Sequence, residues 1–140
     1  MTRSSIVERR YIHREALYLP ISEYELVMKA VGDGTRARIL KLLENGELCV
    51  SDIRKVLFLG QSTVSQHLSL LRKAGLVDIR RQGRRSVYSL TACRSNRYAA
   101  PMLALLLGWL GDDSRVRADR RRLARLAKAG GSAPARPTDG

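Results

Sequence analysis

Several residue types are scarce in this chain of 140 residues, and each scarcity narrows what the chain can be. Two cysteines cannot build a disulfide framework, and so few of them indicate a reducing compartment such as the cytoplasm. The most apolar run, from Ala99 to Leu110, has only 12 residues. A membrane span needs about 20, so we expect a buried helix and no membrane partner. The N-terminus also lacks the pattern of a signal peptide.

Motifs of catalysis and of zinc binding are missing as well. The chain has no nucleophile elbow, no phosphate-binding glycine loop, no paired carboxylates in one cleft and no zinc-finger spacing. Cys49 and His67 could in principle form a thiolate–imidazolium pair. His67, however, falls beside the expected core face of its helix. We therefore expect no enzyme and assign no catalytic residue.

Acidic residues are much less frequent than basic residues in this chain. The chain has 26 lysines and arginines against 13 acids, a net charge of +13, and its pI is near 10.8. From Arg54 to Arg94 there are nine basic residues and one acid, Asp78. Such an excess predicts a polyanionic partner, and its concentration in one stretch favours nucleic acid over a membrane surface.

That stretch, from Ser51 to Leu90, has the pattern of a helix, a tight turn, a second helix and a hairpin. In the second helix, Val64, Leu68 and Leu71 follow helical spacing and should face the core. Two short strands, 76–81 and 85–90, flank a turn that contains glycine. The fold class is therefore mainly α with a small two-stranded β-wing, a winged helix-turn-helix.

The other face of the second helix carries short polar side chains that suit the DNA major groove. An ordinary solvated face is the alternative explanation. At the hairpin, four arginines suit phosphate contacts or a narrow minor groove, and a solubilising cluster is the alternative. The residues that we expect to contact DNA are Gln61, Ser62, Thr63, Ser65, Gln66, Ser69, Arg72, Lys73, Arg80, Arg81, Arg84 and Arg85.

Three runs in this order resemble the ArsR/SmtB family of dimeric bacterial transcriptional repressors: GDGTRARILKLLENGELCVSDI, GQSTVSQHLSLLRKAGLV and RRQGRRSVYSL. The resemblance covers roughly Tyr24 to Leu90. It implies a homodimer on double-stranded operator DNA that is released when an inducer binds, often a thiophilic metal or metalloid. Composition and periodicity show nothing of that release.

The pattern divides the chain into three parts. Residues 1–20 form a basic arm, 21–111 the winged helix-turn-helix domain with its dimerisation helices, and 112–140 a basic, partly disordered tail. Within the tail, residues 115–128 can form a helix with a thin apolar stripe, either solvated and fraying or adding non-specific DNA affinity.

Capping residues set the expected helix starts. Ser22 caps a first helix that runs to Val31, and Asp33 caps a second over 35–44. Ser51 caps the third, and Gln61 or Ser62 caps the fourth.

A fifth helix, 95–110, is apolar around most of its circumference and needs cover on several sides. A second copy of the chain is the natural cover, and the resemblance implies dimerisation through the first and last helices. The residues expected at that interface are Leu103, Leu106, Leu107, Trp109 and Leu110.

An inducer site would centre on Cys49. In metalloid-sensing members of the family, the matching segment carries two cysteines separated by one residue, and here the second is Ser51. Arsenic(III) and antimony(III) need about three soft thiolates, so Cys93 and a subunit mate would have to contribute. Cys49 is a degenerate metalloid ligand, a redox-type thiol switch, or a buried residue without a sensing role. The last helix lacks histidine, so we expect no zinc site there.

Two functions remain. The first is a sequence-specific repressor, released by arsenite, antimonite, another metal or a redox signal. The second is a non-specific or architectural DNA-binding protein without an inducer, for which the basic extensions are the argument.

Overall fold

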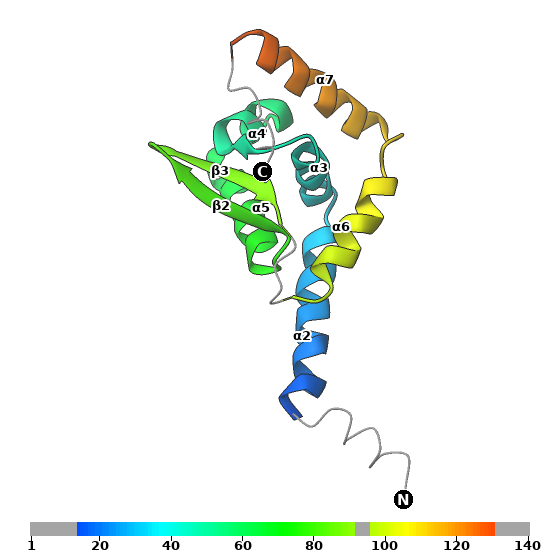
Figure 1. Ribbon diagram of the computed structural model, residues 1–140. Helices are drawn as coiled ribbons and strands as arrows, with labels where there is room; N and C mark the ends of the chain where they lie inside the picture. Colours follow the sequence, from blue (N-terminus) through cyan, green and yellow to red (C-terminus); the bar gives the residue numbers. More distant parts are fainter. Residues whose placement is uncertain (1–13, 92–95, 131–140) are drawn as a thin grey trace, which may run out of the picture.

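The computed structural model describes residues 14–91 and 96–130 of the chain (Figure 1). Helices surround a small antiparallel sheet, with α2 extending away from the body and α7 lying across α3 and α4. None of the described helices is long and apolar enough to cross a membrane. The elements in chain order are α2 (Arg14–Val31), α3 (Gly34–Leu43), β1 (Leu48–Cys49), α4 (Val50–Leu57), α5 (Gln61–Lys73), β2 (Val77–Gln82), β3 (Arg85–Leu90), α6 (Ala99–Gly108) and α7 (Ser114–Lys128).

The expected helix-turn-helix is present as α4 and α5. Val64, Leu68 and Leu71 are fully buried, so the core face of α5 is confirmed. They pack in one cluster with the buried apolar residues of α3 and α4, including Ile39 and Ile53. Gly75 follows α5 with a left-handed φ of 77°, which lets the chain leave the helix without steric cost.

The wing is confirmed, but its sheet has a third strand. β2 and β3 pair antiparallel around Gly83, whose φ of 62° suits the turn. The short strand β1 pairs with β3, placing Leu48 opposite Tyr88 and Cys49 opposite Val87, so the strand order is β1-β3-β2. A two-residue strand has no readable alternation, which is why the sequence did not reveal it.

The predicted caps of the third and fourth helices are wrong because the neighbouring backbone fixes where these helices begin. Pairing within the sheet keeps Cys49 extended, so α4 begins at Val50 and Ser51 lies inside its first turn. Gly60 is the N-cap of α5, so Gln61 and Ser62 are its first two residues.

The first helix begins at Arg14, not after Ser22, and the predicted arm boundary at residue 20 falls inside it. Most residues of 14–19 are good helix formers, which favours this extension. Pro20 falls in the interior of α2, where proline ordinarily kinks or breaks a helix, yet the helix continues to Val31. Residues 1–13 lie outside the described part.

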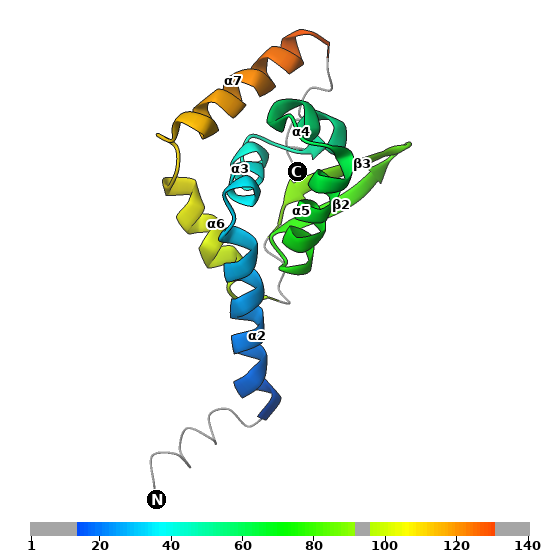
Figure 2. The ribbon, with the colours of Figure 1, turned by 180° about the vertical axis from the view of Figure 1, so that it is seen from behind.

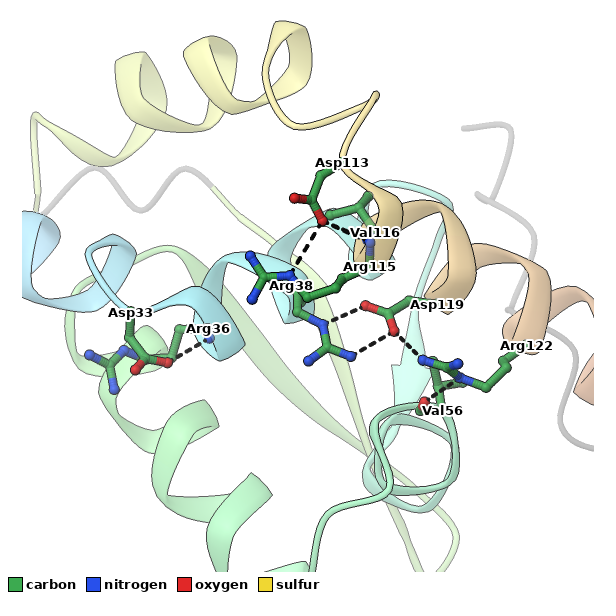
Figure 3. Close-up of polar contacts among 9 residues, drawn as sticks. All are labelled: Asp33, Arg36, Arg38, Val56, Asp113, Arg115, Val116, Asp119 and Arg122. Carbon is green, nitrogen blue, oxygen red and sulfur yellow. Dashed lines mark hydrogen bonds and ion pairs between the residues drawn. The ribbon is translucent and has the colours of Figure 1, made fainter.

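The expected cap of the second helix is confirmed. Asp33 Oδ2 accepts a hydrogen bond from the Arg36 amide at 3.0 Å (Figure 3). That bond holds the pKa of Asp33 below its ordinary value of 3.8. The carboxylate therefore stabilises the fold above pH 3.8, and this contribution is lost as the pH falls through the lowered value.

We expect Asp33→Ala to lower the free energy of unfolding by about 1 kcal/mol at neutral pH, because a helix loses its cap. The difference from the unsubstituted protein should shrink in acid as Asp33 protonates. Urea denaturation at several pH values measures both effects. Asp33→Asn is the control, since asparagine caps a helix without a charge and should give a smaller, pH-independent change. A pH-independent difference for Asp33→Ala would contradict the charge argument.

The helix expected within the tail is present as α7, but it is not solvated: it packs on α3 and α4. Val116 and Leu123 of the predicted apolar stripe are buried. Asp119 of α7 is 1% exposed and accepts two hydrogen bonds of 2.8 Å from Arg38 of α3 (Figure 3). It also accepts a bond of 2.6 Å from Arg122, whose Nε donates to the Val56 carbonyl of α4 at 2.8 Å. This buried charge cluster could not be predicted from the sequence. Residues 131–140 lie outside the described part.

The fifth predicted helix is present as α6, which begins at Ala99 instead of Ser95 and has Pro101 in its first turn. Leu106 lies in the core of its own chain, and its carbonyl accepts a hydrogen bond of 2.6 Å from the buried Lys41. This corrects its assignment to the dimer surface.

Candidate nucleic-acid interface

The polar face of α5 is presented to solvent. Every α5 residue that we expect to contact DNA is exposed, while the apolar face of the same helix is held in the core. The wing lies beside this helix (Figures 1 and 2). The exposed α5 residues are Gln61, Ser62, Thr63, Ser65, Gln66, Ser69, Arg72 and Lys73.

The four wing arginines are exposed, but they differ in their contacts. Arg80 is paired with Glu47, and its donation to that carboxylate holds the pKa of Glu47 below the ordinary value. Arg81 donates to the Ser86 hydroxyl at 3.1 Å. Arg84 and Arg85 have no ion pair within the described residues. Arg80 therefore fastens the wing to the β1 turn, whereas Arg84 and Arg85 are available to a partner.

A hollow of about 280 Å³ lies between the wing and the starts of α4 and α5. Arg54 of α4, which the sequence analysis did not select, joins Arg81, Arg84 and Arg85 in its wall. Arg54 was missed because it is separated in sequence from the hairpin arginines. The remaining lining residues are Cys49, Val50, Ser51, Gln61 and Ser86.

Cys49 lies at the start of α4 and is 6% exposed. Its Sγ is 3.1 Å from the Ser51 Oγ, and it donates to Asp52 Oδ2 at 3.2 Å. Within the described residues, no group of three or more His, Cys, Asp or Glu could hold a metal ion. One thiol beside a hydroxyl and a carboxylate does not suit arsenic(III). Cys93 lies outside the described residues, so its meeting with Cys49 stays a prediction.

His67 packs inside the fold. Its Nδ1 is 3.2 Å from Nη1 of Arg36. The same guanidinium donates from Nη2 to the Lys29 carbonyl and from Nε to the Ala30 carbonyl, both at 2.8 Å. The half-buried imidazole therefore helps to hold α5 against the end of α2. From its place beside the core face, His67 was expected to be structural or to contact phosphate, and these contacts favour the structural role.

An apolar surface lies on α6 and the adjacent part of α2. Leu107 is 66% exposed and Trp109 53% exposed, and Leu105 and Leu110 are also exposed. Ile21 and Tyr24 add exposed apolar area on α2. Leu103 is only half-buried, at the edge of the core. A group of large exposed apolar side chains of this kind marks an interaction surface.

A helix-turn-helix with an exposed polar recognition face, followed by a basic hairpin, defines a winged helix-turn-helix DNA-binding protein. Comparison with known proteins is more specific. The model of the family described as "Bacterial regulatory protein, arsR family" matches residues 33–78. The arsenical resistance operon repressor of Escherichia coli is 37% identical over 107 residues, which cover 76% of this chain and 89% of that protein. The chain therefore belongs to the arsR family of bacterial transcription regulators.

Two further similarities agree with this membership. The arsenic resistance transcriptional regulator ArsR1 of Pseudomonas putida is 42% identical over 78 residues, 55% of this chain and 57% of that protein. The solution structure of the homodimeric winged helix-turn-helix domain Mb0332 of Mycobacterium bovis has a TM-score of 0.58 and 31% identity. That match covers 69% of this chain and 84% of the other chain.

Proposed function

We propose that this protein is a sequence-specific transcriptional repressor that binds an imperfect palindromic operator as a homodimer. The observation that carries the proposal is the two-sided α5, with its apolar face fixed in the core and its polar face exposed. A helix held in this way can enter a major groove as a rigid body. Since DNA is the partner, we place the protein in the cytoplasm.

Side chains on α5 divide into base-reading and backbone-holding groups. Gln66, at the middle of the exposed face, has the amide that pairs bidentately with adenine. Arg72 and Lys73 lie at the end of the helix, where they can hold phosphates. Arg84 and Arg85 would add contacts to the flanking backbone or minor groove.

Two copies of the chain would meet through the apolar surface of α6 and α2. Burial of Leu107 and Trp109 would remove a large apolar area from water. The Mycobacterium bovis relative is described as homodimeric, which supports the same assembly here. Each copy would then present one α5 to one half-site of the operator.

Release from DNA would act through Cys49, by a thiol-reactive inducer or an oxidant. Two relatives are named for arsenic or arsenical resistance, which favours arsenite or antimonite as the compound to test first. The described residues offer one thiol, so a metalloid site would need Cys93 and a cysteine of the partner subunit as well.

Fluorescence anisotropy on labelled DNA from upstream of the gene, with scrambled DNA as competitor, tests the proposal. We expect Gln66→Ala to lose about 1–3 kcal/mol of discrimination at one base position. Gln82→Ala, an exposed glutamine at the hairpin, is the control and should keep the site preference. If Gln66→Ala keeps both affinity and preference, the assigned reading face is wrong.

Two further results of the same measurement decide the class of function. Equal competition by scrambled DNA would contradict specific repression and support the architectural alternative. Arsenite that releases the specific complex, but not that of Cys49→Ser, would establish a metalloid-responsive repressor. A complex that ignores arsenite but responds to oxidants would assign the switch to thiol oxidation.

A further inference from the structure

The hollow between the wing and the helix-turn-helix brings together three segments that are distant in sequence. Cys49 to Arg54 supplies one wall, Gln61 at the start of α5 the second, and Arg81 to Ser86 of the wing the third. β1 holds this arrangement, because it pairs Cys49 with Val87 of the wing strand β3. The shape of the hollow is therefore set by strand pairing within the fold.

The charged side chains that line the hollow are all positive. Four arginines line it and no acidic residue does. Within residues 14–91 and 96–130, neither Arg54 nor Arg84 nor Arg85 has a carboxylate partner. Arg80, by contrast, is outside the hollow and is neutralised by Glu47.

Arg54 differs from the other three arginines in having a buried hydrogen-bond donor without an acceptor. Its Nε atom is buried and has no hydrogen-bond partner in the structure. A buried donor without an acceptor costs free energy, and a turn of the Arg54 side chain toward an anionic oxygen in the hollow would give it one. The N-terminus of α5 adds backbone N–H groups and a positive dipole end, since its N-cap is a glycine without a capping side chain.

We propose that this arginine hollow binds one phosphate group, and that the group belongs to the operator backbone. The fork of an arginine matches phosphate oxygens, and helix N-termini favour them as well. A backbone source follows from position, since the hollow lies between the base-reading helix and the wing, where the DNA strand must pass. This inference rests on the proposed function, and it adds Arg54 as a contact that fixes the register of α5.

Cys49 lies in the wall of the same hollow. A negatively charged group at position 49 would lie beside the Asp52 carboxylate, 3.2 Å from the present Sγ, and would be driven toward the arginines of the same hollow, where it would take the place of the phosphate. A neutral group of equal size would not. The phosphate hollow thus gives thiol chemistry a direct route to DNA release. The charge of the adduct, not its bulk alone, would decide the outcome.

Arg54→Gln in the full-length protein is the first test, measured as DNA affinity against salt concentration. Loss of one phosphate contact reduces the slope of log K against log salt by about one unit. We expect that reduction for operator and scrambled DNA alike, with their affinity ratio unchanged. Arg117→Gln, at an exposed position of α7, is the matched control and should leave the slope as it is.

The outcomes separate this inference from the proposed function. An unchanged slope for Arg54→Gln, in a protein that binds its operator specifically, would overturn the phosphate hollow and leave the repressor. A wild-type protein without sequence preference would contradict the repressor, whatever Arg54 does. Protection against thermal unfolding by inorganic phosphate, lost in Arg54→Gln without a slope change, would move the source from DNA to a small phosphate.

Cys49→Asp and Cys49→Asn form the second test. Both residues are good N-caps for α4 and nearly equal in size, so they differ chiefly in charge. We expect Cys49→Asp to bind operator at least about tenfold more weakly than Cys49→Asn, because its carboxylate occupies the arginines in place of the phosphate. Thermal melting of both variants checks that each is folded. Equal affinities of two folded variants would contradict a shared site for Cys49 and the phosphate.

Discussion

Replacing Asp119 by alanine is expected to lower the free energy of unfolding by about 2–4 kcal/mol. Asp119 is 1% exposed and receives hydrogen bonds from Arg38 and Arg122, at 2.6 to 2.8 Å. Donation to Asp119 raises the pKa of Arg38 above its ordinary value. Removing the carboxylate leaves two guanidinium groups facing each other, and Arg122 then keeps only the Val56 carbonyl as an acceptor. The estimate is below that for a fully buried pair, because both arginines are about a quarter exposed.

Urea denaturation followed by circular dichroism measures this loss. Asp112→Ala is the control, since Asp112 is exposed just before α7 and should change stability by less than about 0.5 kcal/mol. Asp119→Asn keeps the size of the side chain and should also be destabilising, because an amide cannot replace both charged bonds. Similar stabilities for Asp119→Ala and Asp112→Ala would mean that α7 does not depend on this cluster.

Leu107→Glu is expected to convert the proposed homodimer into monomers and to reduce operator affinity by about a hundredfold or more. The side chain is 66% exposed in a single chain, so the substitution should leave the monomer folded. In the dimer, however, it would bury an unpaired charge in an apolar interface. Two linked recognition helices gain affinity because binding of the second half-site becomes intramolecular, an effect of about 10²–10⁴.

Light scattering after gel filtration gives the mass, and anisotropy gives the affinity. Ala124→Glu, at an exposed position of α7, is the matched control and should remain dimeric. A dimeric Leu107→Glu protein would contradict the proposed interface. A monomer with full operator affinity would contradict the requirement for two half-sites.

The helix-turn-helix and the wing could be predicted because their signals are local. Val64, Leu68 and Leu71 repeat at helical spacing, and Gly83 lies in the turn between the two strands. Asp33 could likewise be assigned as a cap, because its partner Arg36 is three residues away.

The features that escaped prediction depend on contacts between distant residues. Arg38 and Asp119 are 81 residues apart, so their bond is invisible to spacing, and α7 looked like a basic tail. Arg54 was overlooked because only the fold brings it to the wing arginines. Ser51 resembled a cap because the pairing of Cys49 with Val87 could not be seen. Leu106 resembled its exposed neighbours because a helix that is apolar nearly all round does not reveal which side faces its own core.

The short strand β1 would limit the spacing of DNA contacts that one subunit can make. It joins the start of α4 to β3, and Arg80 and Glu47 close the same junction. The start of α4 and the hairpin are thereby fastened together, and α5, which packs against α4 and β2, is held with them. The distance between the major-groove contacts of α5 and the flanking contacts of the hairpin would therefore be constant within each half-site. Binding to operators with a different spacing between half-sites would require a change in how the two subunits pack against each other.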